Sequence, residues 1–137
     1  MRLSRGRLVL FLLVVLASTA AAALPIPPPP DHRINDFAGV LPAAERERLE
    51  EKLRSWERES SNQIVVAIFR SLDGENLEDY SIRLAQAWRI GQKGLDNGVI
   101  FLVFLDDRKM RIEVGYGLEG SLTDAVSSSI LRDVVAP

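Results

Sequence analysis

Residues 63–69, QIVVAIF, decide the fold class, because they form an almost unbroken apolar run that is rich in β-branched side chains. Such a run is typical of a strand that is buried on both faces of a sheet. A second run, residues 99–105 (VIFLVFL), has the same character. A helix between two such strands predicts a βαβ unit, in which the strands lie parallel.

Two amphipathic helices are expected around the first of these strands. The earlier helix begins at Pro42, a residue favoured at the first helical position. Its apolar stripe consists of Leu49, Leu53 and Trp56. The charged residues around that stripe, from Glu45 to Glu50, predict a solvated helix face. The later helix ends at Gly91. Its inner side is expected to consist of Leu77, Tyr80, Leu84, Ala87 and Trp88.

The second strand is expected to continue into a hairpin and then a last helix. Residues 106–109 (DDRK) form a polar turn, and residues 110–114 alternate in polarity, as a strand near a sheet edge does. Thr123 or Asp124 caps the helix that follows. Its stripe consists of Val126, Ile130 and Val134. This element order predicts an α/β fold, a three-layer α/β/α sandwich around a small mixed β-sheet.

The N-terminus has the pattern of a secretory signal peptide. Arginines at positions 2, 5 and 7 precede an apolar run over residues 8–16 and a small-residue stretch over residues 17–23. The run is short for a transmembrane helix, which needs about 20 apolar residues. We expect a signal peptide over residues 1–23, cleaved after Ala22 or Ala23, and an exported protein in a periplasm, in a lumen or at a cell surface. The alternative is an uncleaved anchor.

A proline-rich linker is expected over residues 24–32, which read LPIPPPPDH. Proline lacks the amide donor that helices and sheets require, so this segment favours an extended polyproline II conformation. It would hold the domain of residues 33–137 away from whatever precedes it. The alternative is a mere remnant of processing.

Composition excludes several kinds of chemistry. Removal of residues 1–23 takes away three of the 17 basic groups and none of the 19 acidic ones, so the net charge changes from −2 to −5. Such a charge does not favour nucleic acid as a partner. The chain has no cysteine, which excludes disulfides, thiolate zinc sites and thiol nucleophiles. His32 is the only histidine, which argues against a Ser-His-Asp triad.

Oxygen ligands remain, and three aspartates lie at loop positions. Asp36 precedes the first predicted helix, Asp96 precedes the second strand, and Asp124 begins the last helix. Together with the amide of Asn97, they suit a hard cation, and calcium tolerates irregular loops better than magnesium does. Each also has a structural interpretation, since residues 96–98 form a good turn, Asp124 caps a helix and Asp36 bonds to local amides. Spacing alone does not show that the three carboxylates converge.

Several segments resemble the TPM domain family. They are residues 35–41 (NDFAGVL), 63–66 (QIVV), 88–91 (WRIG), 96–99 (DNGV), 111–119 (RIEVGYGLE) and 122–124 (LTD). The resemblance runs from about residue 33 to the last residue and implies an α/β/α sandwich. Members are typically exported or lumenal, divalent ions, chiefly calcium, are associated with the fold, and a thylakoid lumen member is described as an acid phosphatase of photosystem repair.

Carried over by position, the resemblance implies an acidic cleft made by Asp36, Asp96 and Asp124, with Asn97 and Gly98 in its wall. Pro42 stands where a serine often caps the first helix in the family. The chain also stops at Pro137, where relatives continue through another helical stretch. The C-terminal part of the domain is therefore expected to be missing here, and a membrane anchor is expected only in that part.

Two functions compete on this evidence. The first is a calcium-dependent binding or assembly module, whose partners are a divalent cation and a protein of the envelope or membrane. The alternative is a metal-assisted phosphatase for phosphomonoesters, in which Asp96 acts as nucleophile or base. A purely structural stalk domain is a third class. The first is favoured, because the sequence offers no catalytic-type histidine and no Asp-x-Asp pair.

Overall fold

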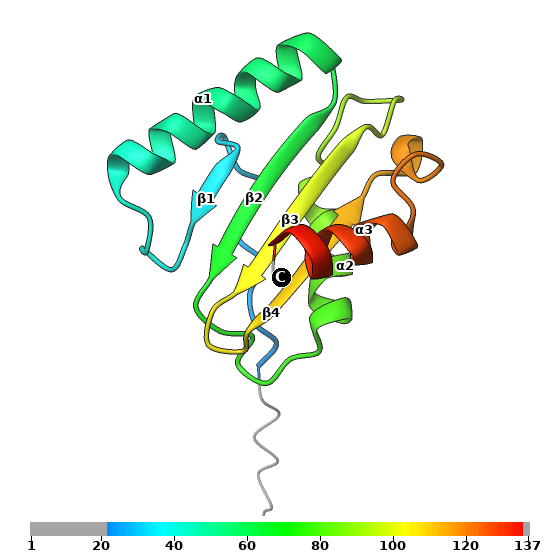
Figure 1. Cartoon of the computed structure of the whole chain (residues 1–137). Helices are drawn as coiled ribbons and strands as arrows, with labels where there is room; N and C mark the ends of the chain where they lie inside the picture. The colour runs from blue at the N-terminus through cyan, green and yellow to red at the C-terminus, as the bar shows by residue number, and fades with distance from the viewer. Residues whose placement is uncertain (1–21, 136–137) are drawn as a thin grey trace, which may run out of the picture.

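Four strands form one mixed sheet in the computed structural model, which describes residues 22–135 (Figure 1). They are β1 (Ile34–Asp36), β2 (Gln63–Phe69), β3 (Gly98–Phe104) and β4 (Lys109–Val114), and they lie side by side in that order. β1, β2 and β3 are parallel, while β4 pairs with β3 in the antiparallel sense. The predicted βαβ unit and hairpin are confirmed. Residues 1–21, most of the predicted signal peptide, lie outside the described residues.

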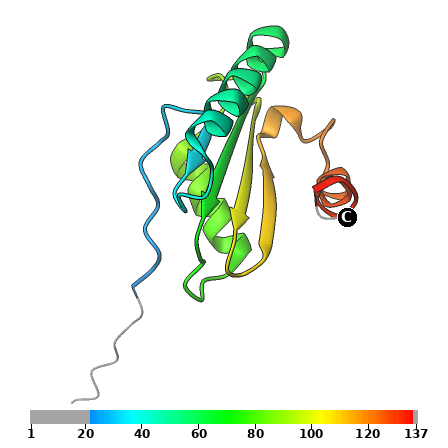
Figure 2. The same ribbon diagram turned by 60° about the vertical axis from the view of Figure 1, so that its left-hand side comes forward.

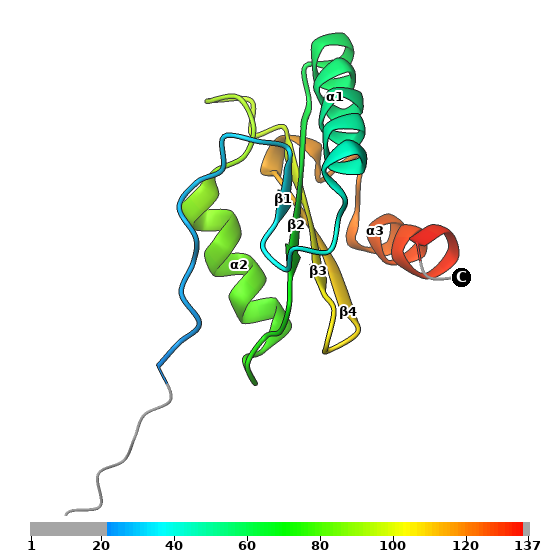
Figure 3. The ribbon, with the colours of Figure 1, turned by 90° about the vertical axis from the view of Figure 1, so that its left-hand side faces the viewer.

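Helices cover both faces of the sheet and complete the predicted three layers. Figure 3 shows α2 (Leu77–Trp88) on one face, with α1 (Ala43–Ser60) and α3 (Asp124–Ile130) on the other. Two short turns, η1 (Tyr116–Leu118) and η2 (Leu131–Val135), flank α3 in the chain. Within residues 22–135, none of the helices combines the length and the apolar character needed to cross a membrane.

Local chemistry explains the helix boundaries. Pro42, the predicted first residue of α1, is its N-cap, so the helix begins one residue later, at Ala43. Asn76 caps α2 by accepting from the amide of Asp79. Thr123 caps α3, since its Oγ1 accepts from the amide of Val126 at 3.3 Å. α2 ends earlier than predicted, because Arg89 already adopts the left-handed conformation that terminates helices.

The best-packed part of the core lies between the sheet and α2. Side chains of β2 and β3, namely Val65, Ala67, Phe69, Ile100, Leu102 and Phe104, are buried beneath Tyr80, Leu84 and Trp88. The rings of Phe69 and Phe104 stack at 5.2 Å, and Tyr80 meets both edge-on. Ala87 was predicted to face inward but is exposed. Ser81 is buried on the inner side of α2 instead, and its hydroxyl donates to the carbonyl of Leu77.

The opposite face of the sheet is covered less completely. No residue of α1 is buried, and its predicted stripe is only partly covered, with Trp56 39% exposed. The predicted stripe of α3 is also largely open, since Val126 and Val134 are both exposed. The α2 side therefore holds the main core.

The proline-rich segment packs against the domain and does not hold it at a distance. Residues 24–30, here named the N-terminal strap, run alongside α2 (Figure 2). Leu24 and Ile26 pack against the core, and the indole Nε1 of Trp88 donates to the carbonyl of Pro27 at 2.8 Å. Prolines lack amide donors but keep their carbonyls, so the strap can still accept hydrogen bonds. This differs from the spacer predicted for the segment.

Candidate functional site

A cleft of about 950 Å³ opens where the C-terminal end of α2, the loop of residues 91–98 and the end of β4 meet. Its walls carry ionisable side chains of both signs and one exposed aromatic ring. These are Arg89, Lys93, Asp96, Glu113 and Tyr116. The cleft thus contains one of the three predicted aspartates together with two cations that the sequence analysis did not assign to the site.

Close backbone packing holds the cleft loop against the end of β4. A Cβ on Gly115 would stand 2.2 Å from the carbonyl oxygen of Asp96, and one on Gly117 would stand 1.9 Å from that of Leu95. Only glycine permits such approaches. The amide of Gly117 also donates to the Asp96 carbonyl at 3.0 Å. Both glycines thus bring backbone close to backbone.

Asp96 presents its carboxylate to the cleft from a constrained position. Its φ of 46° lies in the left-handed region, which costs a residue other than glycine of the order of 1 kcal/mol. The side chain is exposed, and none of the hydrogen bonds or ion pairs formed among residues 22–135 uses its carboxylate oxygens. Asp96 is therefore a fixed anionic group available to a ligand.

Glu113, the other carboxylate of the cleft, is already partnered. It forms an ion pair with the neighbouring Arg111, whose guanidinium also lies 4.0 Å from Glu78. Asp96 is consequently the carboxylate that a cation in this cleft would meet first.

Asn97, predicted as a ligand, has a structural role. Its side chain is buried, with 6% exposed. Its Oδ1 accepts from the amide of Gln92 at 2.7 Å, and its Nδ2 donates to the carbonyl of Ser61 at 2.7 Å. The amide thereby ties the cleft loop to the end of α1.

The other two predicted aspartates lie elsewhere. Asp36 pairs with Ile68 near one end of β2, while the Asp96 loop adjoins Gln63 at the other, so the two are separated by roughly 16 Å of strand. Both oxygens of Asp36 accept amides, from Gly39 at 2.8 Å and from Leu41 at 2.7 Å. Asp124 lies in the first turn of α3.

The expected convergence is therefore not found in the part of the chain that the structure describes. No group of three or more His, Cys, Asp or Glu side chains there is arranged to hold a metal ion. Asp36 instead lines a separate hollow of about 640 Å³ beside α1, where Arg46 and Arg54 accompany the acidic side chains.

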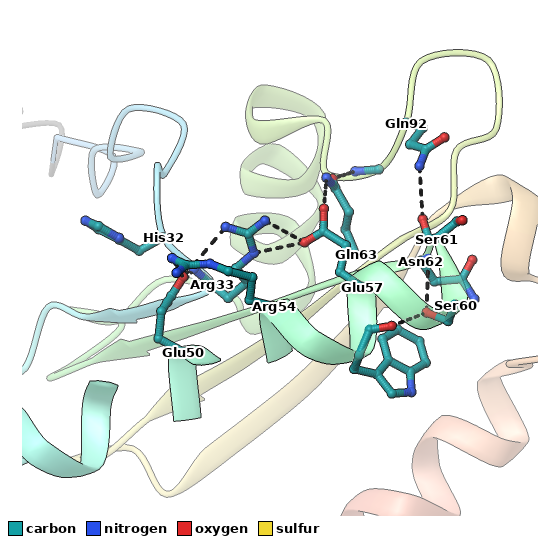
Figure 4. Close-up of polar contacts among 12 residues, drawn as sticks. His32, Arg33, Glu50, Arg54, Glu57, Ser60, Ser61, Asn62, Gln63 and Gln92 are labelled. Carbon is teal, nitrogen blue, oxygen red and sulfur yellow. Dashed lines mark hydrogen bonds and ion pairs between the residues drawn. The ribbon is translucent and has the colours of Figure 1, made fainter. Parts of the chain in front are cut away.

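A polar network links α1 to the rim of the cleft (Figure 4). Glu50 accepts the amides of Arg33 and Ile34 at 2.7 and 2.8 Å. The Arg33 guanidinium donates twice to Glu57, and Glu57 in turn accepts from Gln63 at 2.7 Å. The side-chain oxygen of Gln63 accepts a hydrogen bond from the backbone amide of Gly91, where the cleft loop begins.

Sequence reasoning missed this network. The charged residues from Glu45 to Glu50 were expected to be solvated, which holds for Glu45 but not for Glu50. Glu57, to which no role was given, is also largely covered. Burial acts to raise the pKa of Glu57, but the hydrogen bonds from Gln63 and Arg33, with nearby guanidinium charge, lower that pKa below its usual value. The available signal was the seven-residue spacing of Glu50 and Glu57, which places both carboxylates on one helix face.

Comparisons with known proteins agree with the fold. A model of the TPM domain matches residues 34–137. One similar structure is the solution structure of the N-terminal domain of a protein from P. gingivalis, which is 34% identical in sequence. The match covers 77% of this chain and 68% of that one, with a TM-score of 0.70. The solution structure of the N-terminal domain of a Corynebacterium glutamicum protein is 19% identical, covers 78% and 67%, and has a TM-score of 0.57, which supports the fold alone. No curated protein matches the chain.

Proposed function

Since the chain belongs to the TPM domain family, we propose that it is an exported binding module that takes up a divalent cation at Asp96. Calcium is the cation favoured, with magnesium second. The observation that carries the proposal is the exposed, unbonded carboxylate of Asp96 in a cleft whose loop is fixed by close backbone contacts. A pre-organised anionic oxygen is the kind of ligand that hard cations bind.

Asp96 is chosen over Asn97 and Asp36 because of their contacts, and over Asp124 because Asp124 does not line the cleft. The Asn97 amide is buried and used on both sides, and both oxygens of Asp36 already accept amides. A site with one free carboxylate must draw its other ligands from main-chain carbonyls and water. Such a site is expected to be weak, with a Kd of the order of 10⁻⁴ to 10⁻³ M, as in extracellular calcium modules.

The binding role includes an envelope or membrane protein as partner. Tyr116, at the mouth of the cleft, is 81% exposed, and Leu95 is exposed beside the turn that carries it. Tyrosine is one of the residue types that most often anchor protein interfaces. A cation at Asp96 would lie next to such an anchor and could couple ion binding to assembly.

A second candidate function is the metal-assisted acid phosphatase. The observation that favours it is that Arg89 and Lys93 line the same cleft as Asp96. Two cationic side chains beside a carboxylate could bind a phosphomonoester. The divalent metal ion would polarise the phosphoryl group, and Asp96 would act as nucleophile or base.

Calorimetric titration with calcium and magnesium tests the first function. Residues 24–137 are compared with Asp96→Asn and with two matched controls, Asp36→Asn and Asp124→Asn. We expect affinity to fall about tenfold or more for Asp96→Asn only, because a charged oxygen ligand is lost. Unchanged affinity in Asp96→Asn, or equal losses in all three variants, would contradict the site.

A phosphatase assay on the same proteins separates the two candidates. Turnover of p-nitrophenyl phosphate is measured with and without calcium or magnesium. If the protein hydrolyses the ester and both Asp96→Asn and Arg89→Gln abolish turnover, the phosphatase is supported. Calcium binding at Asp96 without turnover supports the binding module alone.

A further inference from the structure

The N-terminal strap is anchored to α2 at three points along its length. The amide nitrogen of Leu24 donates to Oε1 of Glu75, just before α2 begins. Further along, the Tyr80 hydroxyl donates to the carbonyl of Pro25 at 3.3 Å, and Trp88 donates to that of Pro27. Figure 3 shows the strap in blue, following α2 on the same side of the sheet. The first contact differs from the others because its acceptor is charged.

Glu75 is well placed to hold a positive charge. Its side chain is only 19% exposed, and its Oε2 forms an ion pair with Arg83, which itself stands over the ring of Tyr80 at 5.4 Å. Oε1 remains for the nitrogen of Leu24. Solvent screens a partly covered carboxylate less than it screens one on an open surface.

We propose that Glu75 is the docking site of the processed N-terminus, the α-ammonium group of Leu24. This inference rests on the export part of the proposed function. Of the two cleavage positions predicted, the one after Ala23 frees the same nitrogen atom that contacts Glu75. A signal peptidase would hydrolyse the Ala23–Leu24 peptide bond with one water, leaving a carboxylate on Ala23 of the released peptide and an ammonium group on Leu24.

Cleavage thereby strengthens a contact that the strap needs. A polyproline segment has no internal hydrogen bonds, and chain ends fray unless they are tied down. Conversion of the Leu24 amide into an ammonium group keeps the donor and adds a positive charge opposite Glu75. The neutral amide donor thus becomes one partner of an ion pair with the partly covered Glu75 carboxylate, which adds a Coulomb attraction to the hydrogen bond. Ala22 and Ala23 are exposed, so their removal uncovers nothing else.

A thermodynamic cycle tests the docking. Residues 24–137, which contain every strand and helix described, are prepared with a free Leu24 amine and with an acetylated one, each with Glu75 and with Glu75→Gln. Acetylation keeps a donor but removes the charge. We expect it to raise the equilibrium constant for urea unfolding about tenfold with Glu75 and less than twofold with Glu75→Gln.

The control is Glu78→Gln, which removes an exposed carboxylate from the first turn of α2. In that variant acetylation should cost as much as in the unchanged protein. Equal costs with Glu75 and Glu75→Gln, or no cost in either, would overturn the docking.

A second measurement avoids dependence on how well Glu75→Gln folds. Hydrogen exchange of the Trp88 indole N–H in the unchanged sequence reports whether the strap is seated, because that proton is bonded to the carbonyl of Pro27. Acetylation should speed this exchange several-fold under native conditions. Equal exchange rates with free and acetylated amines would contradict the proposal.

Mass spectrometry of the exported protein separates this inference from the function on which it rests. A mature chain that begins at Leu24 is expected. A chain that begins at Ala23 would be exported but would overturn the assignment of Leu24. Retention of residues 1–23 would overturn the docking of Leu24, whereas the proposed function is tested separately by cation binding at Asp96.

Discussion

Substitution of Gly117 by alanine should release the loop that presents Asp96. An added Cβ would stand 1.9 Å from the carbonyl oxygen of Leu95, far inside contact distance, and the obstacle is backbone. The loop must move by more than 1 Å, which also breaks the bond from the Gly117 amide to the Asp96 carbonyl. Overpacking costs roughly 1–3 kcal/mol and a lost hydrogen bond about 1 kcal/mol, so we expect a destabilisation of about 2–4 kcal/mol.

Gly120→Ala is the matched control for this substitution. An added Cβ at Gly120 meets no atom within 4 Å, and neither glycine has a positive φ. Alanine there should be neutral or slightly stabilising, since it restricts the unfolded chain. The two variants thus differ mainly in the contact with the cleft loop.

Urea unfolding, followed by tryptophan fluorescence, measures the difference. With an m-value of about 1–3 kcal/mol per molar urea, the midpoint for Gly117→Ala should lie about 0.7–4 M below that for Gly120→Ala. Calcium affinity should fall in the same variant, because Asp96 loses its fixed position. Equal midpoints for the two variants would refute the claim that close backbone packing holds the loop.

Three further outcomes are expected. Trp88→Phe removes the hydrogen bond to the Pro27 carbonyl but keeps an aromatic ring. Urea unfolding should show that the free energy of unfolding falls by about 1–2 kcal/mol. No loss would mean that the strap is not seated against α2. Burial raises the pKa of Tyr80 from 10.0 to about 12, so the unfolded chain loses this proton first as the pH rises. The free energy of unfolding should therefore fall by about 1.4 kcal/mol at pH 11. A Tyr80→Phe variant with the same alkaline loss would contradict this. The pKa of Glu57 is lowered, so its contribution to stability is present above the usual pKa of 4.5 and is lost as the pH falls through the native pKa. Glu57→Gln should therefore flatten the acid side of the plot of stability against pH. An unchanged plot would argue against the network.

Most of the sheet could be predicted because its inner strands are apolar runs. β2 begins and ends where the QIVVAIF stretch does, and β3 and β4 each lie within one residue of their predicted bounds. β1 could not be predicted, since it is three residues long and contains Asn35 and Asp36, residue types that strands disfavour. It exists because β2 offers a free edge and Glu50 binds the amide of its first residue.

The missed strand also explains why the three carboxylates were expected to meet. Asp36 ends β1, whereas Asp96 precedes β3. In parallel strands, the C-terminal end of one strand and the N-terminal end of another lie at opposite ends of the sheet. Without β1, the position of Asp36 relative to the sheet had no reference. The role of Asn97 was hidden for a similar reason, because its partner Ser61 is distant in sequence and becomes a neighbour only when β2 and β3 pair.

Two sets of polar contacts connect the N-terminal segment to the elements that form the cleft. Arg33, which follows the proline-rich segment in the chain, is held by Glu57; Glu57 binds Gln63, and Gln63 receives the amide of Gly91 at the start of the cleft loop. Tyr80 and Trp88 bind the strap from the helix whose end forms another wall of the same cleft. If Leu24 is the processed N-terminus, its docking would hold the strap against α2, whose end forms one wall of the cleft that contains Asp96.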